Sequence, residues 1–225
     1  MALRQTLKNA LSPFYEQFIP SYEAELRNAV AGCKSLLDVG CGSSSPIKAF
    51  SKSLYCVGVD LHEPSIADSR RQGIHNVCYV MDVLDIDRRF KENSFDCVLA
   101  LGVIEHLNKE AGVKLLEKME KIAKKKVIIM MPNGFVPQGV HFDNPLQVHK
   151  SGWSVQEMRR YGYAVTGLSG WKPLRGEAGN IKYRPYTLWA GISLLSKPFV
   201  RTMPVHAFEL LCIKQLERDH QQRSE

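Results

Sequence analysis

The chain has 225 residues, of which 44% are hydrophobic and 24% are charged. This composition excludes a disordered or fibrous chain, and the length suits one folded domain, which we expect to span residues 1–225. The net charge of +7 leaves anionic small molecules, nucleic acid and an anionic membrane surface open as partners. No stretch approaches the ~20 apolar residues that span a bilayer, and the polar N-terminus lacks the apolar segment of a secretory signal. We therefore expect a soluble, cytoplasmic protein.

Two helices are predicted in residues 1–31, ahead of the first strand. Apolar residues recur at helical spacing from Leu3 to Phe14 and again from Tyr22 to Val30, on either side of Pro20. Aromatic residues at such spacing usually pack on the core of a domain.

The segment 35–43 is an apolar run that ends in Asp38, Gly40 and Gly42. Glycine is favoured where the backbone turns sharply or approaches a ligand closely, because it lacks a Cβ atom. The segment therefore predicts a strand that ends in a nucleotide-binding loop. A dinucleotide-binding fingerprint needs a third glycine where this chain has Ser45, so an NAD-dependent oxidoreductase is a weaker interpretation.

Three further strand-like runs also end in an acid or a glycine: residues 54–60 in Asp60, residues 77–82 in Asp82, and residues 95–102 in Gly102. Asp60 lies 22 residues after Asp38, about the distance at which a Rossmann unit places its ribose-binding carboxylate. Because ligands bind beyond the carboxyl ends of parallel strands, these residues predict one shared crevice.

Beyond the fourth strand, apolar residues from Leu115 to Ala123 predict a helix whose C-terminal end carries Lys124–Lys126. A lysine cluster at that end of a helix is favoured by the helix dipole and is usually solvated. Residues 127–131 predict a buried fifth strand. The following loop, 132–153, is rich in turn-forming residues, and loops at the ligand edge of a sheet often carry function.

Ser154 and Glu157 have the spacing of a capping box, which predicts a helix over 154–161. A sixth strand is predicted at 164–168 and a last one at 208–213. Between them, residues 171–205 contain six Lys or Arg and only one acid. Basic residues among aromatic ones suit single-stranded nucleic acid, an anionic small molecule or an anionic membrane surface. Residues 186–195 are too short to span a bilayer, so they predict a helix packed on the core or, alternatively, a peripheral membrane contact.

These features resemble the class I S-adenosylmethionine-dependent methyltransferases, specifically the type 11-like group that acts on small molecules. The resemblance covers roughly residues 35–170 and rests on Leu37–Gly42, Val57–Asp60, Met81–Val83 and Leu101–Leu107. It implies an α/β, Rossmann-like sheet of seven strands, mostly parallel with an antiparallel last strand, and with helices on both faces. The segment 171–205 is then interpreted as an insertion that caps the substrate.

The resemblance also implies a set of site residues. Asp60 would bind the ribose of the cofactor, Asp82 the adenine amino group with Val83 nearby, and the Gly40–Gly42 backbone the methionine end. The expected cofactor-binding residues are Asp38, Gly40, Cys41, Gly42, Asp60, Leu61, Asp82, Val83, Leu101 and Gly102. The expected substrate-binding residues are Tyr22, Glu105, Trp153 and Trp171.

Transfer of a methyl group to a hydroxyl needs a base, and histidine is the usual one because its pKa lies near neutral pH. The candidate catalytic residues are His106, His141 and His149. Glu105 is placed to orient His106. The six cysteines form no CxxC pair, so we expect neither a disulfide nor a metal site.

The function predicted from the sequence is methyl transfer from S-adenosylmethionine, with S-adenosylhomocysteine as product, to a small or medium-sized metabolite. O-methylation is favoured over N-methylation, and an anionic or lipid-linked acceptor suits this interpretation. Methylation of RNA and a non-catalytic cofactor-binding module are the alternatives, since a fold does not fix a function. The basic charge supports the RNA alternative, and the intact Asp60 and Asp82 argue against a decayed site.

Overall fold

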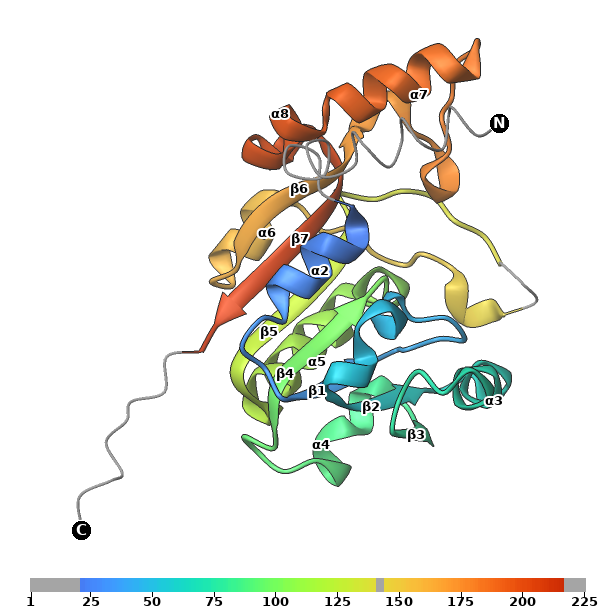
Figure 1. Ribbon diagram of the computed structural model, residues 1–225. Helices are drawn as coiled ribbons and strands as arrows, with labels where there is room; N and C mark the ends of the chain where they lie inside the picture. Colours follow the sequence, from blue (N-terminus) through green and yellow to red (C-terminus); the bar gives the residue numbers. More distant parts are fainter. Residues whose placement is uncertain (1–20, 141–143, 217–225) are drawn as a thin grey trace.

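The computed structural model describes residues 21–140 and 144–216. Its centre is a seven-stranded sheet in the order β3-β2-β1-β4-β5-β7-β6 (Figure 1). The strands are β1 (Ser35–Val39), β2 (Tyr55–Asp60), β3 (Val77–Val80), β4 (Phe95–Leu101), β5 (Ala123–Pro132), β6 (Ala164–Trp171) and β7 (Ala207–Gln215). β7 runs antiparallel to both β5 and β6, whereas the other neighbouring pairs are parallel. The predicted fold class is therefore confirmed.

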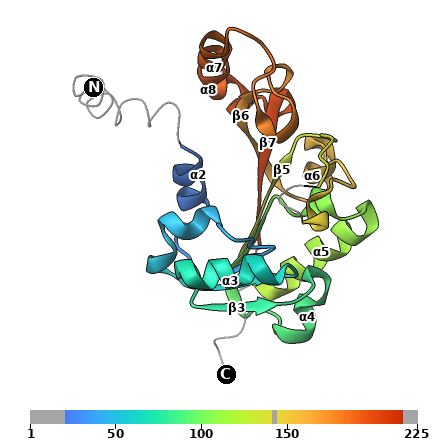
Figure 2. The ribbon, with the colours of Figure 1, turned by 90° about the vertical axis from the view of Figure 1, so that its right-hand side faces the viewer.

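Helices cover both faces of the sheet. They are α2 (Tyr22–Ala29), α3 (Glu63–Gln72), α4 (Ile86–Arg89), α5 (Lys109–Ile122), α6 (Val155–Arg160), α7 (Tyr186–Leu195) and α8 (Lys197–Thr202). Viewed along the sheet, α2 lies on one side, and α5 and α6 lie on the other (Figure 2). The predicted capping box of α6 is present, because Ser154 and Glu157 each bond the backbone N–H of the other.

Each face of the sheet has its own core. Successive side chains of the central strands point to opposite faces of the sheet. Those on one face pack against Leu115, Leu116 and Met119 of α5. Those on the other face pack against Leu26 and Ala29 of α2. The apolar spacing that predicts these two helices therefore corresponds to the faces that they bury.

The lysine cluster at 124–126 differs from the prediction. Its residues lie in β5 rather than at the end of α5, which stops at Ile122. Lys126 Nζ donates to the carbonyl oxygens of Ala29 and Ala31, and Lys125 Nζ donates to that of Gly32. These carbonyls follow the C-terminal end of α2, where a helix dipole favours positive charge. The cluster thus stabilises a different helix from the one expected.

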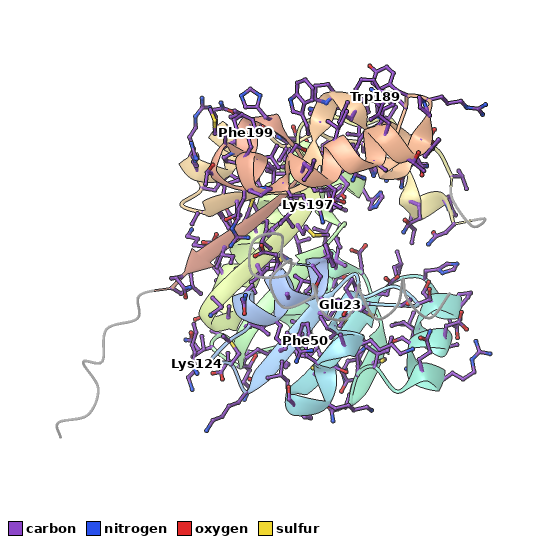
Figure 3. The ribbon with its side chains drawn as sticks, turned by 45° about the horizontal axis from the view of Figure 1, so that its top comes forward. Glu23, Phe50, Lys124, Trp189, Lys197 and Phe199 are labelled. Carbon is purple, nitrogen blue, oxygen red and sulfur yellow. The ribbon has the colours of Figure 1, made fainter. Side chains whose placement is uncertain are left out.

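The segment 171–205 forms a layer at one end of the sheet, made chiefly of α7 and α8 (Figure 1). Glycines let this layer approach the sheet closely. A Cβ atom on Gly167 would lie 2.0 Å from the carbonyl oxygen of Val200, and one on Gly170 would lie 2.4 Å from that of Ser193. Figure 3 shows Trp189 and Phe199 on the outer side of the layer and Lys197 on the side that faces α2.

All six cysteines are buried and free. Within the described ranges, none of the helices is both long and apolar enough to cross a membrane.

Candidate active site

The site forms where the chain order of the strands reverses, between β1 and β4. Glycines follow both strands in the left-handed region, Gly40 at φ 69° and Gly102 at φ 69°. A Cβ atom on Gly40 would lie 2.6 Å from Val103 Cγ2. The two loops therefore touch, and only glycine fits at position 40. In open α/β sheets this reversal point is where ligands bind.

Asp60 fixes the loop that follows β1. Its Oδ2 accepts the backbone N–H of Gly42 and its Oδ1 accepts that of His62, each at 2.8 Å. Asp82 is held in a similar way, since its Oδ1 accepts the N–H of Leu84 at 2.8 Å. Both carboxylates are thus set in position by backbone donors, and each oxygen keeps a lone pair for a further donor.

A first cavity of about 210 Å³ opens beside these two acids. Six predicted cofactor-binding residues line it: Gly40, Asp60, Leu61, Asp82, Val83 and Gly102. The opposite wall comes from the loop before α6 and contains Asn144, Leu146, Gln147 and Lys150. His106 also lines this cavity.

Asp38, by contrast, lies beneath the loop. Its Oδ2 is 2.9 Å from Nε2 of His75, whose Nδ1 is 2.9 Å from Oγ of Ser69. This has the connectivity of a hydrolase triad, but Ser69 is 0% exposed and Asp38 is 1% exposed, so no substrate reaches the hydroxyl. The connection joins β1, α3 and the turn between α3 and β3, and it is structural. Cys41 is likewise buried, in a small cluster with Ile66 and Cys78.

A second cavity of about 320 Å³ adjoins the first. The two share Gly102, His106 and Gln147. The second cavity is also lined by the predicted residues Leu101, Glu105 and His149. Glu209 of β7 lines it as well, and its carboxylate accepts the hydroxyl of Ser169.

Glu105 is the most unusual group in this cavity. It is 4% exposed, and its Oε2 has no hydrogen-bond partner among the described residues. Burial raises the pKa of its carboxyl to about 8, and the negative charge of Glu209 adds to the rise. The position of Glu105 is fixed through its backbone, since its carbonyl accepts the N–H groups of Lys150 and Ser151 at 2.8 and 3.0 Å.

The two histidines lie against each other, with ring centroids 4.9 Å apart. His106 Nδ1 is 3.3 Å from the carbonyl oxygen of Val148, and His149 Nδ1 is 2.6 Å from that of Val136. Burial lowers the pKa of His106 to about 4, so its ring is neutral at physiological pH.

A third cavity of about 560 Å³ borders the second, with which it shares Val136 and Phe208. The basic side chains Lys172, Arg175 and Lys182 line it. All three belong to the segment 171–205. The segment also contributes Glu177, so it supplies three basic groups and one acid next to the cavity that contains Glu105.

The remaining predicted substrate-binding residues lie elsewhere. Trp153 is fully buried, and its Nε1 donates to the carbonyl of Ile104 and to Ser151 Oγ. Trp171 is 40% exposed on the surface, and Tyr22 lines a small separate cavity between α2 and β6. His141 lies outside the described residues.

Sequence reasoning missed Glu209, Gln147 and Lys150. The signal for Glu209 is a lone acid inside the apolar run of the last strand. Gln147 and Lys150 belong to the loop 132–153, which the sequence marks as functional without indicating which side chains turn toward the crevice.

Comparisons with known proteins show what the chain is similar to. The family model described as a methyltransferase domain matches residues 37–131. The probable tRNA methyltransferase 9B of Mus musculus is 28% identical over 86 residues, which make up 38% of this chain and 18% of that protein. Its counterpart in Homo sapiens is 26% identical over 88 residues, or 39% of this chain and 18% of that protein. The match thus spans less than a fifth of these curated relatives.

Solved structures share the fold over almost the whole chain. A SAM-dependent methyltransferase from Archaeoglobus fulgidus superposes with a TM-score of 0.56 at 20% identity, covering 90% of this chain and 98% of that one. The complex between the Haloferax volcanii Trm112 methyltransferase activator and the putative methyltransferase gives 0.57 at 14% identity, covering 96% and 99%. Residues 37–131 therefore match the methyltransferase-domain model, and the described chain shares the fold of a SAM-dependent methyltransferase.

Proposed function

We propose that the chain transfers the methyl group of S-adenosylmethionine to a hydroxyl oxygen of a small or medium-sized metabolite. The observation that carries this proposal is the meeting of two cavities at Gly102, His106 and Gln147. The first contains the two fixed carboxylates, and the second contains the ionisable cluster. A cofactor in one and an acceptor in the other would meet at this junction.

The residues of the first cavity fit the nucleoside part of the cofactor. Asp60 suits the ribose hydroxyls and Asp82 the adenine amino group, because both carboxylates are acceptors held in place by backbone N–H groups. Leu61 and Val83 line the same cavity and supply apolar surface for the adenine ring. When bound, the cofactor supplies an electrophilic methyl group.

The second and third cavities suit an acceptor with a hydroxyl at one end and an anionic group at the other. The hydroxyl would lie near Glu105, His106 and His149, and the anionic group near the basic side chains of the third cavity. Exposed apolar residues on α7 and α8, among them Leu188, Leu195 and Phe199, also suit a lipid-linked acceptor.

The chemistry requires little covalent participation from the protein. The acceptor oxygen forms a bond to the methyl carbon while the carbon–sulfur bond breaks, and the electron pair of that bond remains on sulfur. Positioning the two reactants in line supplies much of the lowering of the barrier. The imidazoles of His106 and His149, which line the second cavity, are candidate acceptors of the hydroxyl proton.

Methylation of RNA is the second candidate function. It is favoured by the names of the curated relatives, which are probable tRNA methyltransferases, and by the net charge of +7. Phosphate contacts would make binding of such an acceptor fall steeply with salt concentration.

The acceptor class is tested with radiolabelled S-adenosylmethionine and an extract of the source organism, separated into small-molecule, lipid, protein and RNA fractions. We expect label in the small-molecule or lipid fraction. Labelling of RNA that decreases as the salt concentration rises would instead show that the acceptor is RNA and not a metabolite.

The cofactor site is tested by calorimetric titration with S-adenosylhomocysteine. We expect binding to the wild type, loss of binding in Asp60→Ala, and unchanged binding in Glu117→Ala, which removes an exposed acid on α5. Thermal melting of each variant shows that the comparison concerns folded protein. Equal affinity of wild type and Asp60→Ala would contradict the assignment.

A further inference from the structure

Glu105, His106 and His149 form one compact cluster in the second cavity. One ligand atom from each side chain lies within 4.8 Å of the other two. Glu105 and His106 belong to the 3-10 turn Ile104–His106 that follows β4, and His149 belongs to the loop before α6. The hydrogen bonds from the Lys150 and Ser151 N–H groups to the Glu105 carbonyl hold these two segments together.

Both imidazoles are oriented in the way that suits a metal ligand. The Nδ1 atoms of His106 and His149 face the backbone carbonyls of Val148 and Val136. A carbonyl oxygen only accepts, so each Nδ1 carries the proton and each Nε2 keeps its lone pair. Histidines that bind metals usually donate their other ring N–H to a carbonyl or carboxylate in this manner.

The carboxylate of Glu105 is a second indication of a metal site, independent of how the two histidines are oriented. Oε2 of Glu105 is buried and lacks a partner among the described residues, although buried polar atoms are normally satisfied. The side chain lines the second cavity together with both histidines. When Glu105 is ionised, the lone pair of a neutral ring nitrogen cannot satisfy its carboxylate, whereas a cation between them would satisfy all three groups.

We propose that Glu105, His106 and His149 hold a divalent first-row transition metal ion. Two imidazoles and one carboxylate are the donor set of metal sites that keep positions open for a substrate or water. Metal–ligand bonds of about 2.1 Å place two ligand atoms at most roughly 4.2 Å apart, so side-chain shifts below about 1 Å would close the cluster around an ion.

The role of the ion rests on the proposed function. A hydroxyl oxygen of the acceptor binds at an open position, and the ion lowers the pKa of that hydroxyl. The proton leaves to solvent water, and the oxygen attacks the methyl carbon as the carbon–sulfur bond breaks toward sulfur. His106 lines both cavities, so the ion stands at the junction where acceptor and cofactor meet.

The test uses the full chain, stripped of metal with a chelator and dialysed. Mn²⁺ is titrated with loss of its free electron paramagnetic resonance signal as the readout, and Zn²⁺ is titrated by calorimetry. We expect one ion of either kind per chain in the wild type. Glu105→Gln and His149→Asn should abolish this stoichiometric binding, whereas the matched controls Glu117→Gln and His62→Asn should retain it.

Absence of binding in the wild type, or stoichiometric binding that persists in both Glu105→Gln and His149→Asn, would overturn the proposal. S-adenosylhomocysteine affinity, measured on the same stripped samples, shows that each variant is folded. It also separates the two proposals, because the cofactor residues Asp60 and Asp82 are not in the cluster. Failure of the cofactor to bind would count against the proposed function, whereas the ion count decides the metal site.

Discussion

At the scale of single residues, the acids that follow the strands have different tasks although their sequence contexts look alike. Asp60 and Asp82 line the first cavity. Asp38, which pairs with Gly58 and so lies two residues earlier in the register than Asp60, is buried and partnered by His75. The difference arises because Asp38 lies two residues further from the strand end, where His75, in the turn between α3 and β3, meets its carboxylate.

Asp38→Ala should therefore act on stability rather than on cofactor affinity. Removing the carboxylate leaves the buried His75 Nε2 without its partner, which costs about 2 kcal/mol in the free energy of unfolding. Urea denaturation measures this cost, and Asp38→Asn, which retains an acceptor oxygen, should recover most of it. Loss of S-adenosylhomocysteine binding without destabilisation would instead return Asp38 to the cofactor site.

At the scale of elements, the packing around a helical glycine determines how its substitution affects stability. Gly112 of α5 lies under the ring of Trp153, and a Cβ atom there would lie 2.5 Å from Trp153 Cζ2. Gly191 of α7 has no atom within 4 Å of such a Cβ. Trp153 looks like a ligand-binding aromatic in the sequence, but this packing makes it part of the core.

The two glycines form a matched pair for a stability measurement. Gly112→Ala should lower the free energy of unfolding by about 1–3 kcal/mol, because the methyl group overpacks the core. Gly191→Ala should raise it by about 0.5–1 kcal/mol, because alanine is the better helix former. Thermal or urea denaturation of both variants checks the signs, and a stabilising Gly112→Ala would show that α5 and Trp153 are less closely packed.

The capping box of α6 predicts a pH dependence. Burial opposes ionisation of Glu157, but hydrogen bonds from Lys109 and Ser154 outweigh it and hold the pKa of Glu157 below 4.5. A lowered pKa in the folded state gives stability that is full above pH 4.5 and is lost as pH falls through the folded-state value. Glu157→Gln should thus destabilise the protein at pH 7 by about 0.5 kcal/mol.

The difference between Glu157→Gln and wild type should shrink as the pH is lowered below 4.5. Urea midpoints measured at pH 7 and in acid give the comparison. If the difference in stability between Glu157→Gln and wild type were the same at both pH values, the charge of Glu157 would not contribute to stability.

At the scale of the whole molecule, the basic layer 171–205 and the sheet together enclose the proposed acceptor site. The layer packs closely on β6 because β6 has glycines at the contact. Lysine and arginine side chains of the layer line the third cavity, which borders the second. The first cavity, which is proposed to bind the cofactor, contains no residue of this layer among those described. Acceptor binding and cofactor binding should therefore respond differently when the layer is displaced.

Gly167→Ala tests this separation. The added Cβ would lie 2.0 Å from the Val200 carbonyl and 2.7 Å from the Cβ of Ala207, so α8 must move away from β6. We expect a raised KM for the acceptor and unchanged affinity for S-adenosylhomocysteine. Equal losses of both would show that the layer supports the whole crevice.

The strand pattern and the acids after the strands were readable from the sequence because they depend on local periodicity and on glycine conformation. Every predicted strand is present. The crevice predicted at the strand ends is also present, and it is lined by Asp60, Asp82 and Gly40. Position along one strand determines these features, and the parallel sheet then brings the strand ends to one edge.

Only the tertiary structure decided which side chains of the loops meet. Glu105 and His106 contact His149 because the segment before α6 folds back over the end of β4, and Glu209 of β7 lines the same cavity. The same packing takes Trp153 into the core and sends Lys125 and Lys126 to the end of α2. Contacts between segments distant in sequence depend on how elements pack, and no local pattern encodes that packing.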